Sequence, residues 1–592
     1  MGAEAGEKER DSQLFSEDEM ARRGDKGLRI FLLALAFILT FSAVTAKLVY
    51  LQLVKADEYR KLAEDQRNHL LELKPRRGRI LDRNGEVLAY SMECYNVYAI
   101  SYLVKDVQKA SSELSLVLKL PRQELESKIR SSRGFVYLAR KVDVATAESI
   151  KSMGLEGIGL EKDSKRVYPN KELACHVLGY VGTDNVGLSG LELQYEDLLA
   201  GKRGKAAMEL DARGEPIPGV TRMLEEPEDG KDIHLTLDAQ LQFKLQDELK
   251  KAVAETGAAW GAALVMDAWT GEILAMGVYP DFDLNRYPEV KPELTRNRSV
   301  TDAFEPGSVL KMATALACLE ARVVSPSTVL HVPTELRVGS STFRDDHPMP
   351  KSDLTFDEVI AQSSNVGTIK AAQMLGKEGL HRFLARLGLG KTTGVDFPGE
   401  NPGRLPALGG WSETTLPTVA IGQGVAVSQL QLAVLTAAVA NGGRLVRPHF
   451  LKSVGEEGRG EAREQGDEGD TLCSPEAAAS LRKMLGDVVT FGTGTRAAMV
   501  GYNCGGKTGT AMKPSPRGGY SRAYMASFAG FAPLEDPRLV AVITLDDPSP
   551  VYGGLTAAPC FSGVMEFALQ RLGVPLSLDK VNTKDLAGKK AR

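Results

Sequence analysis

The residues best suited to covalent chemistry are a serine and a lysine three positions apart, Ser308 and Lys311. They lead into an apolar stretch, Val309 to Glu320, in which Lys311, Thr314 and Glu320 are the polar residues. A helix that is apolar nearly all round is a buried helix, and lysine is seldom buried without a partner or a task. The spacing of three places both side chains on one helix face. A hydroxyl beside a desolvated amine is the arrangement of an activated nucleophile.

The same pair also fits an ordinary helix start. In that interpretation Ser308 caps the helix and Lys311 reaches out to water. Because Ser-x-x-Lys is a common pattern, it does not choose between the two interpretations by itself. Two further motifs lie downstream, Ser-Ser-Asn at 363–365 and Lys-Thr-Gly-Thr at 507–510. Each of these alone is typical of a helix cap or a glycine-rich turn.

Taken together, Ser-x-x-Lys, Ser-x-Asn and Lys-Thr-Gly in this order are the signature of penicillin-binding proteins and class A β-lactamases. On these motifs the chain resembles the class B penicillin-binding proteins, which are peptidoglycan D,D-transpeptidases. The resemblance extends to the Arg-Gly-x-Ile-x-Asp-Arg-Asn-Gly block at 77–85, Tyr168-Pro169, Gly-x-x-Gly-Leu-Glu at 187–192, and Gly-Thr-Gly-Thr at 492–495. The chain departs from the family at Val309-Leu310, where Thr-Phe is frequent, and both replacements can pack on an apolar helix. Residues 182–193 are more similar to the septal branch, which serves division or sporulation, than to the elongation branch.

The resemblance implies a role for each motif residue. Ser308 attacks the carbonyl of the penultimate D-Ala of a stem peptide and expels the terminal D-Ala, and an amine from a neighbouring stem then takes the acyl group. The resemblance also makes Lys311 the candidate base and Ser363 the relay of a proton to the leaving amine. It implies that Asn365 binds a substrate amide, that Lys507 and Thr508 bind the terminal carboxylate, and that the substrate backbone approaches at Gly509. The N–H groups of Ser308 and Thr510 form the implied oxyanion hole. No metal or cofactor is implied.

Lys311 must lose its charge to act as a base. Moving its pKa from about 10.4 to about 7 requires roughly 4 to 5 kcal/mol of differential destabilisation of the ammonium form. Burial in an apolar helix and a nearby Lys507 can supply such a shift.

Composition sets the broad class. The chain has 592 residues, of which 43% are hydrophobic and 25% charged, with a formal net charge of -4. This balance gives no reason to expect nucleic acid as a partner. The six cysteines are scattered without metal-ligand or redox spacing, so we interpret them as buried small residues and leave disulfides open.

An uncharged segment near the N-terminus, Ile30 to Ala46, predicts a membrane anchor. Its seventeen residues span about 26 Å as a helix, near the short end of the membrane-spanning range. Arginines and lysines precede it, so the N-terminus is expected in the cytoplasm and the rest on the periplasmic, extracytoplasmic side. A cleaved signal peptide is the alternative, because Val44-Thr45-Ala46 resembles a cleavage site, but the apolar run is long for one.

Six segments follow from these patterns: a polar, disordered cytoplasmic tail (1–27), a transmembrane anchor (28–50), a mixed pedestal domain of the dimerisation type (51–220), a linker (221–232), a transpeptidase domain (233–576) and a disordered tail (577–592). A strand at 233–237, a helix at 238–254 and a hairpin at 261–279 precede the nucleophile helix. The predicted fold class is therefore α+β, with helices packed on an antiparallel sheet as in penicillin-binding proteins and β-lactamases. Residues 455–470 predict a solvated acidic insertion.

The motifs do not tell whether an amine or water takes the acyl group, so a D,D-carboxypeptidase or β-lactamase-type hydrolase is an alternative. A non-enzymatic β-lactam sensor is another, although an idle copy should have lost Ser308, Lys311 or Lys507. The expected partners are peptidoglycan stem peptides on lipid-linked or nascent glycan, β-lactam antibiotics and the cytoplasmic membrane. Residues 52–220 are too few for a glycosyltransferase domain, so the resemblance implies a separate multi-spanning glycan polymerase and divisome proteins as further partners.

Overall fold

The computed structural model describes residues 5–210, 216–455, 461–462, 470–515 and 518–577. The chain forms two compact units. The first comprises Met1–Lys74 and Arg203–Glu228, and the second comprises Pro75–Lys202 and Asp229–Arg592. The residues predicted as one pedestal, 51–220, are therefore shared between the units. Residues 75–202 join the second unit because β2 (Ile80–Leu81) pairs in parallel with β8 (Ile233–Leu235).

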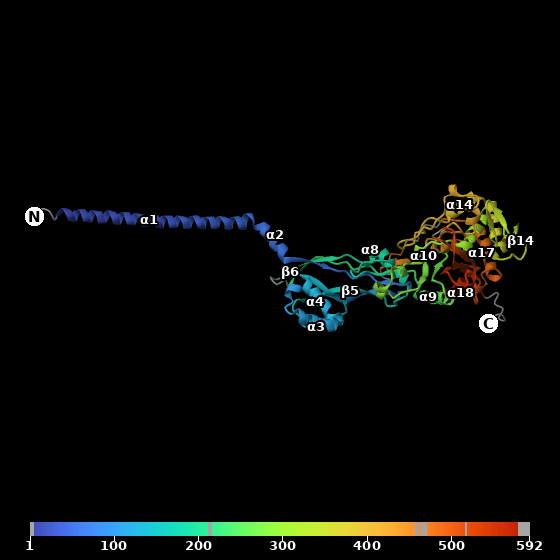
Figure 1. Ribbon diagram of the computed structural model, residues 1–592, viewed down its shortest axis with the longest axis horizontal. Coiled ribbons are helices and arrows are strands. Elements are labelled where there is room, and N and C mark those ends of the chain that lie inside the picture. Colours follow the sequence, from blue (N-terminus) through green and yellow to red (C-terminus); the bar gives the residue numbers. More distant parts are fainter. Residues whose placement is uncertain (1–4, 211–215, 456–460, 463–469, 516–517, 578–592) are drawn as a thin grey trace. The chain divides into compact units, whose positions relative to one another are not determined.

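The first unit begins with a long helix, α1 (Ala5–Val49), which Figure 1 shows in blue. It continues through a π-helical turn (Tyr50–Val54) into α2 (Ala56–Arg67). Residues 27–54 are long and apolar enough to cross a membrane, and they contain the predicted anchor. The predicted disorder of residues 1–27 is wrong from Ala5 onward, because alanine, glutamate, lysine and arginine favour a helix that the apolar segment continues.

A three-stranded antiparallel sheet completes this unit, in the order β1 (Asn68–Leu73), β6 (Gly204–Leu210) and β7 (Pro216–Glu225). Strand β7 occupies residues 221–225 of the predicted linker. Pairing with β6 satisfies backbone groups that a linker would leave to water.

The second unit contains a seven-stranded sheet in the order β16-β15-β8-β2-β3-β4, with β5 also paired to β3. The remaining strands of this sheet are β3 (Val87–Ile100), β4 (Phe135–Val142), β5 (Ile158–Val167), β15 (Leu451–Val454) and β16 (Glu461–Ala462). The hairpin predicted at Asn84-Gly85 is confirmed as β2 and β3, with Gly85 at φ +87°. Helices α3 (Val107–Leu118), α4 (Arg122–Ser131) and α5 (Val144–Ser152) share a small core with β3 and β4. Three short helices follow, α6 (Cys175–Leu178), α7 (Gly190–Gln194) and α8 (Glu196–Leu199).

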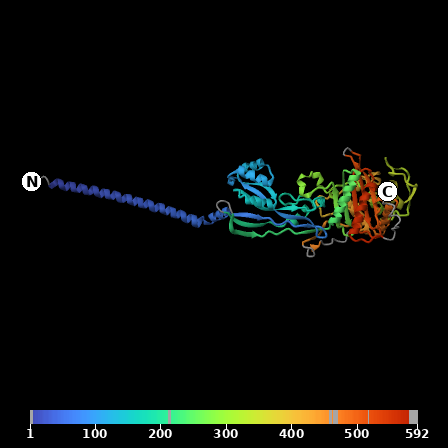
Figure 2. The ribbon, with the colours of Figure 1, turned by 90° about the horizontal axis from the view of Figure 1, so that it is seen from below.

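The part of the second unit that carries the three motifs is built on a five-stranded antiparallel sheet in the order β10-β9-β19-β18-β17. Its strands are β9 (Trp260–Asp267), β10 (Ile273–Tyr279), β17 (Gly505–Pro514), β18 (Tyr520–Ala532) and β19 (Leu539–Asp546). Helices α9 (Ala239–Thr256) and α18 (Gly553–Arg571) pack against one face of the sheet and lie side by side, green and red in Figures 1 and 2. The predicted strand at 233–237, the helix after Asp238 and the hairpin at 261–279 are all confirmed.

The other face of the sheet packs on a helical layer that carries two of the three motifs. Its helices are α10 (Arg298–Thr301), α11 (Lys311–Glu320), α12 (Phe356–Ala361), α13 (Asn365–Leu375), α14 (Lys377–Arg386), α15 (Thr415–Ala420), α16 (Gln429–Ala440) and α17 (Pro475–Thr490). Four short strands pair outside the large sheets, β11 (Val329–His331) with β14 (Asp353–Thr355) and β12 (Leu336–Val338) with β13 (Ser341–Phe343).

All six cysteines are buried and unbonded to one another, which confirms their interpretation as small core residues. Most of the acidic insertion predicted at 455–470 lies outside the described residues, although β16 within it pairs with β15. The predicted C-terminal disorder also falls on residues outside the described part, apart from Ser577.

Candidate active site

A 3₁₀ turn over Gly307–Leu310 contains Ser308 and leads directly into α11, and we call it the nucleophile turn after the predicted role of Ser308. Gly307 has φ +53°, a conformation that favours glycine. No side-chain hydrogen bond caps this turn or the start of α11, and Lys311 is fully buried. The interpretation of Ser308 as a simple cap and Lys311 as a solvent-exposed lysine is therefore wrong. Every residue of α11 from Lys311 to Leu319 is buried, as the apolar pattern predicts.

The amine of Lys311 donates to three acceptors on the 363–365 segment. Its Nζ lies 2.6 Å from the carbonyl oxygen of Ser363, 2.7 Å from Oδ1 of Asn365 and 3.3 Å from Oγ of Ser363. This is the full donor capacity of an ammonium group. The second motif thus holds the lysine of the first.

Lys507, on edge strand β17, reaches the same hydroxyl from the other side. Its Nζ lies 2.8 Å from Oγ of Ser363, and the side chain is fully buried. The hydroxyl of Ser363 therefore stands between two amines that are 196 positions apart in the chain. It can accept from one amine and donate to the other when one of them is neutral.

Burial lowers the pKa of both amines. The pKa of Lys311 falls to about 8, although the carboxylates of Asp346 and Asp345 oppose the shift. Burial lowers the pKa of Lys507 well below its usual range, and the positive charge of Lys311 lowers it further. Two buried amines around one hydroxyl do not both keep a full charge near neutral pH. The site can therefore supply one neutral amine as a base and one cation.

The backbone at Ser363 is held in a strained conformation. Its φ is +58°, which costs a residue with a side chain about 1 to 3 kcal/mol. The turn is fixed from both sides, because the N–H of Ser363 donates to the carbonyl of Ile360 and Ser364 caps α13 through the N–H of Gly367. This conformation lets both the carbonyl and the hydroxyl of Ser363 meet Lys311.

Sequence reasoning missed Asp345, which supports the second motif from a loop. Its carboxylate accepts from Oγ of Ser364 at 3.1 Å, from the N–H of Asn365 and from the N–H of Val366 at 3.1 Å. A carboxylate at a helix N-terminus stabilises the free N–H groups there. The sequence offers only a weak indication of this role. Asp345 and Asp346 form an acidic pair in a polar segment, and Asp345 lies 19 positions before Ser364, the residue that caps α13.

A cavity of about 300 Å³ opens over Ser308. From the three motifs Ser308, Ser363, Thr508 and Thr510 line it, and the rest of its wall is Asp346, His347, Met349, Thr493, Tyr552, Gly554 and Leu555. The hydroxyl of Thr508 lies 2.8 Å from that of Thr493. The edge strand β17 thus borders a space that is lined by Ser308, the predicted nucleophile, and by several other hydroxyl groups.

Gly509 contacts the nucleophile turn. A Cβ on this glycine would lie 2.6 Å from Cγ2 of Val309 and 3.0 Å from the carbonyl oxygen of Pro306. The glycine therefore lets the nucleophile turn pack directly on β17. That it also admits a substrate backbone stays a prediction.

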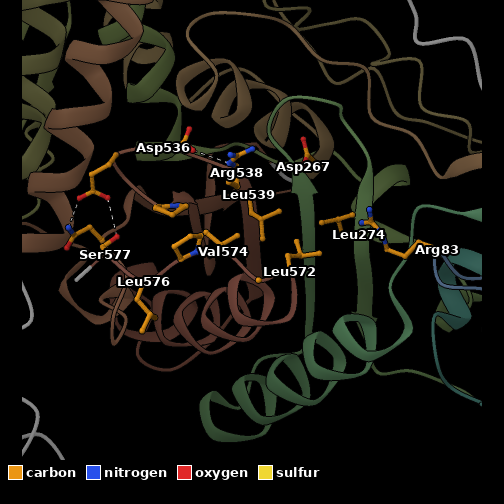
Figure 3. A pocket seen from close by; sticks show the side chains of 15 residues that line it. Arg83, Asp267, Leu274, Asp536, Arg538, Leu539, Leu572, Val574, Leu576 and Ser577 are labelled. Atoms are coloured by element: carbon orange, nitrogen blue, oxygen red, sulfur yellow. Dashed lines mark hydrogen bonds and ion pairs between the residues drawn. The ribbon is translucent and has the colours of Figure 1, made fainter. Parts of the chain in front are cut away.

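A larger cavity, of about 1010 Å³, lies beside the ends of β9 and β10 and the segment after α18 (Figure 3). None of its fifteen lining residues belongs to the three motifs. Asp536 and Arg538 on its wall pair with each other at 3.2 Å. The chemistry predicted from the sequence is therefore confined to the smaller cavity.

Comparison with known proteins agrees with this geometry. Residues 261–566 match the penicillin binding protein transpeptidase domain, and residues 72–235 match the penicillin-binding protein dimerisation domain. Stage V sporulation protein D of Bacillus subtilis is 32% identical over 94% of this chain and 88% of its own length. The probable peptidoglycan D,D-transpeptidase PbpC of Pseudomonas aeruginosa is 33% identical over 93% of this chain and 96% of its own. The crystal structure of penicillin binding protein 3 from Mycobacterium tuberculosis, complexed with ampicillin, is similar with a TM-score of 0.67 and 30% identity, covering 86% of this chain and 98% of that one.

Proposed function

Because the chain belongs to the penicillin-binding proteins with a transpeptidase domain, we propose that it is a serine D,D-transpeptidase that cross-links peptidoglycan stem peptides and is acylated by β-lactams. One observation carries the proposal. Ser308 and Ser363 line the same cavity, and the hydroxyl of Ser363 is hydrogen-bonded to two buried amines, those of Lys311 and Lys507.

Binding of the donor stem begins at its terminal carboxylate. We assign this group to Lys507 and Thr508, since a carboxylate beside Lys507 favours the charged form of that lysine. With a positive charge fixed there, Lys311 is the amine that becomes neutral. An extended peptide can then pair with the free edge of β17.

Acylation follows from this charge distribution. Neutral Lys311 takes the proton of Ser308 Oγ, and the oxygen attacks the carbonyl carbon of the penultimate D-Ala. The oxyanion is stabilised by the N–H groups of Ser308 and Thr510, each worth about 3 to 4 kcal/mol in comparable sites. The carbon–nitrogen bond then breaks, and the proton that Lys311 took from Ser308 passes through the hydroxyl of Ser363 to the leaving amine of the terminal D-Ala.

The acyl-enzyme is resolved by an amine from a second stem. Its nitrogen attacks the ester carbonyl, the bond to Ser308 Oγ breaks, and the serine recovers its proton. In this scheme Asn365 holds Lys311 through Oδ1 and is also placed to bind a substrate amide.

We assign the segments outside the catalytic domain as follows. Residues 1–27 lie in the cytoplasm, 28–50 span the membrane, and the parts from 51 onward lie outside it, in agreement with the positive flank of the anchor. We place the enzyme in septal wall synthesis, in division or sporulation, supported by residues 182–193 and by the similarity to a sporulation protein. Its glycan polymerase is a separate multi-spanning protein that acts together with divisome proteins.

Turnover of labelled stem peptides by the full-length protein tests the reaction type. The proposal predicts cross-linked dimer together with released D-Ala when an acceptor stem is present. Release of D-Ala without dimer would reassign the protein as a carboxypeptidase. Depletion in cells tests the septal role, with filaments or arrested spores expected and round cells contradicting it.

A further inference from the structure

The wall of the catalytic cavity carries one carboxylate beside the lysine pair, that of Asp346. Its charge opposes the lowered pKa of both Lys311 and Lys507, so it lies within electrostatic reach of both amines. In the part of the chain that the structure describes, its carboxylate has no hydrogen bond or ion pair. The neighbouring Asp345 differs, because its oxygens are occupied by donors at the start of α13.

The position of Asp346 is fixed by that neighbour. Asp345 holds the loop against α13 through Ser364, Asn365 and Val366. Asn365 adds a fourth bond, in which Nδ2 donates to the carbonyl of Arg344 at 2.9 Å. The next residue, Asp346, is thereby presented to the cavity in which Ser308 lies.

The charge of the cavity changes during the proposed reaction. While the donor is bound, its terminal carboxylate offsets the positive charge of the lysine pair. Once the terminal D-Ala has left, that carboxylate is gone and the pair keeps its charge. The second substrate approaches as an ammonium ion, which a net positive cavity repels.

From these contacts we propose that Asp346 binds the ammonium group of the acceptor stem and holds it beside the acyl-enzyme carbonyl. The inference rests on the proposed transpeptidase function. It names the group that makes an amine, and not water, the preferred nucleophile toward the acyl-enzyme. The ammonium gives one proton to the neutral lysine of the pair and becomes an amine. The amine forms the new carbon–nitrogen bond, the bond to Ser308 Oγ breaks, and the second proton goes to that oxygen.

The partition of one acyl-enzyme between aminolysis by an added nucleophile and hydrolysis by water tests this role. At a given acceptor concentration, the ratio of aminolysis product to hydrolysis product does not depend on how fast the acyl-enzyme forms. Any effect of Asp346 on the rate of acylation therefore leaves this ratio unchanged. The full-length protein is given a labelled pentapeptide donor and either a stem with a free side-chain amine or hydroxylamine, which is neutral at the assay pH.

In Asp346→Asn we expect the ratio for the cationic stem to fall about 2- to 5-fold, as for one charge contact at an exposed site. The ratio for hydroxylamine should stay the same. Asp353→Asn is the matched control, because it removes the same charge from an exposed strand residue outside the cavity, and it should change neither ratio. An unchanged ratio for the cationic stem, or an equal fall for both nucleophiles, would overturn the proposal. Wild-type protein that forms neither cross-linked dimer with the cationic stem nor hydroxamate with hydroxylamine would instead refute the transpeptidase function itself.

Discussion

The amines of Lys311 and Lys507 meet at one oxygen, the hydroxyl of Ser363, at 3.3 and 2.8 Å. Both are fully buried, and burial lowers the pKa of each. Burial therefore lets these two lysines, a residue type that usually lies at the surface, act as one neutral base and one cation. The two can exchange a proton through the hydroxyl of Ser363. Predictions about pH, substitution and stability follow from this relationship and from the contacts that hold it.

Acylation should depend on pH through Lys311. Its pKa is lowered to about 8, so the neutral form grows as the pH rises through that value and is lost below it. The rate of acylation by a penicillin should increase about tenfold per pH unit below 8 and level off above it. Lys311→Arg, which stays protonated, should lose acylation at every pH. Stopped-flow measurement of the acylation rate checks this, and a profile that is flat from pH 6 to 9 would contradict it.

Asn365→Asp should move this pH dependence upward. The change places a carboxylate where the amide oxygen now accepts from Lys311 at 2.7 Å. An opposite charge at that distance raises the pKa of the amine by about 1 to 3 units. The midpoint of the acylation profile should therefore lie at 9 or above. A midpoint that stays near 8 would show that a different group limits the rate.

Asp345→Ala should weaken both the fold and the site. The substitution removes an acceptor for Ser364, Asn365 and Val366, and such a cap is worth about 1 to 2 kcal/mol. We expect the free energy of unfolding to fall by that amount, and acylation to slow because Asn365 and Ser363 lose their support. Denaturant titration and penicillin labelling measure the two effects. Asp353→Ala, at an exposed strand position, is the control and should change neither.

Gly509→Ala should separate the nucleophile turn from β17. The added methyl would lie 2.6 Å from Val309, and atoms at that distance must move. Since Val309 is adjacent to Ser308, a shift of the turn displaces the nucleophile relative to Thr510. We expect kcat/KM to fall about 100-fold while the melting temperature changes little. Unaltered kcat/KM would mean that the turn tolerates the displacement.

The buried charge cluster of residues 75–202 should be sensitive to loss of Glu192. This carboxylate is fully buried and bonds Arg77 at 2.7 Å and Arg166 at 2.6 Å. Glu192→Gln takes the paired carboxylate away from Arg166, while Arg77 keeps its ion pair with Glu196, and breaking a buried ion pair in this way costs about 3 to 5 kcal/mol. Glu196→Gln, a more exposed partner of Arg77, should cost much less. Thermal unfolding measures the stability of Glu192→Gln and of Glu196→Gln. Equal losses of stability in the two variants would contradict this expectation.

Local patterns in the sequence were sufficient to predict much of the catalytic domain. The apolar run after Lys311 predicted a buried helix, Asp238 predicted a helix start, and Asn84-Gly85 predicted a hairpin, because each depends on neighbouring residues. The resemblance to a known family then placed three distant motifs in one site, and the structure brings them together around Ser363.

Features that depend on distant contacts were not predictable in this way. The capping role of Asp345 arises from a loop whose path the sequence does not reveal, and the packing of Gly509 on the nucleophile turn joins segments 200 positions apart. The extent of β7 likewise depends on pairing with β6. In each case the energy comes from tertiary contacts that outweigh local propensity.

The most direct test of the account is to locate the covalent adduct of a penicillin by mass spectrometry of the full-length protein. We predict a single adduct on the peptide that contains Ser308, and none in Ser308→Ala. An adduct that persists in Ser308→Ala, or that maps to any other residue, would contradict the assignment of Ser308 as the nucleophile.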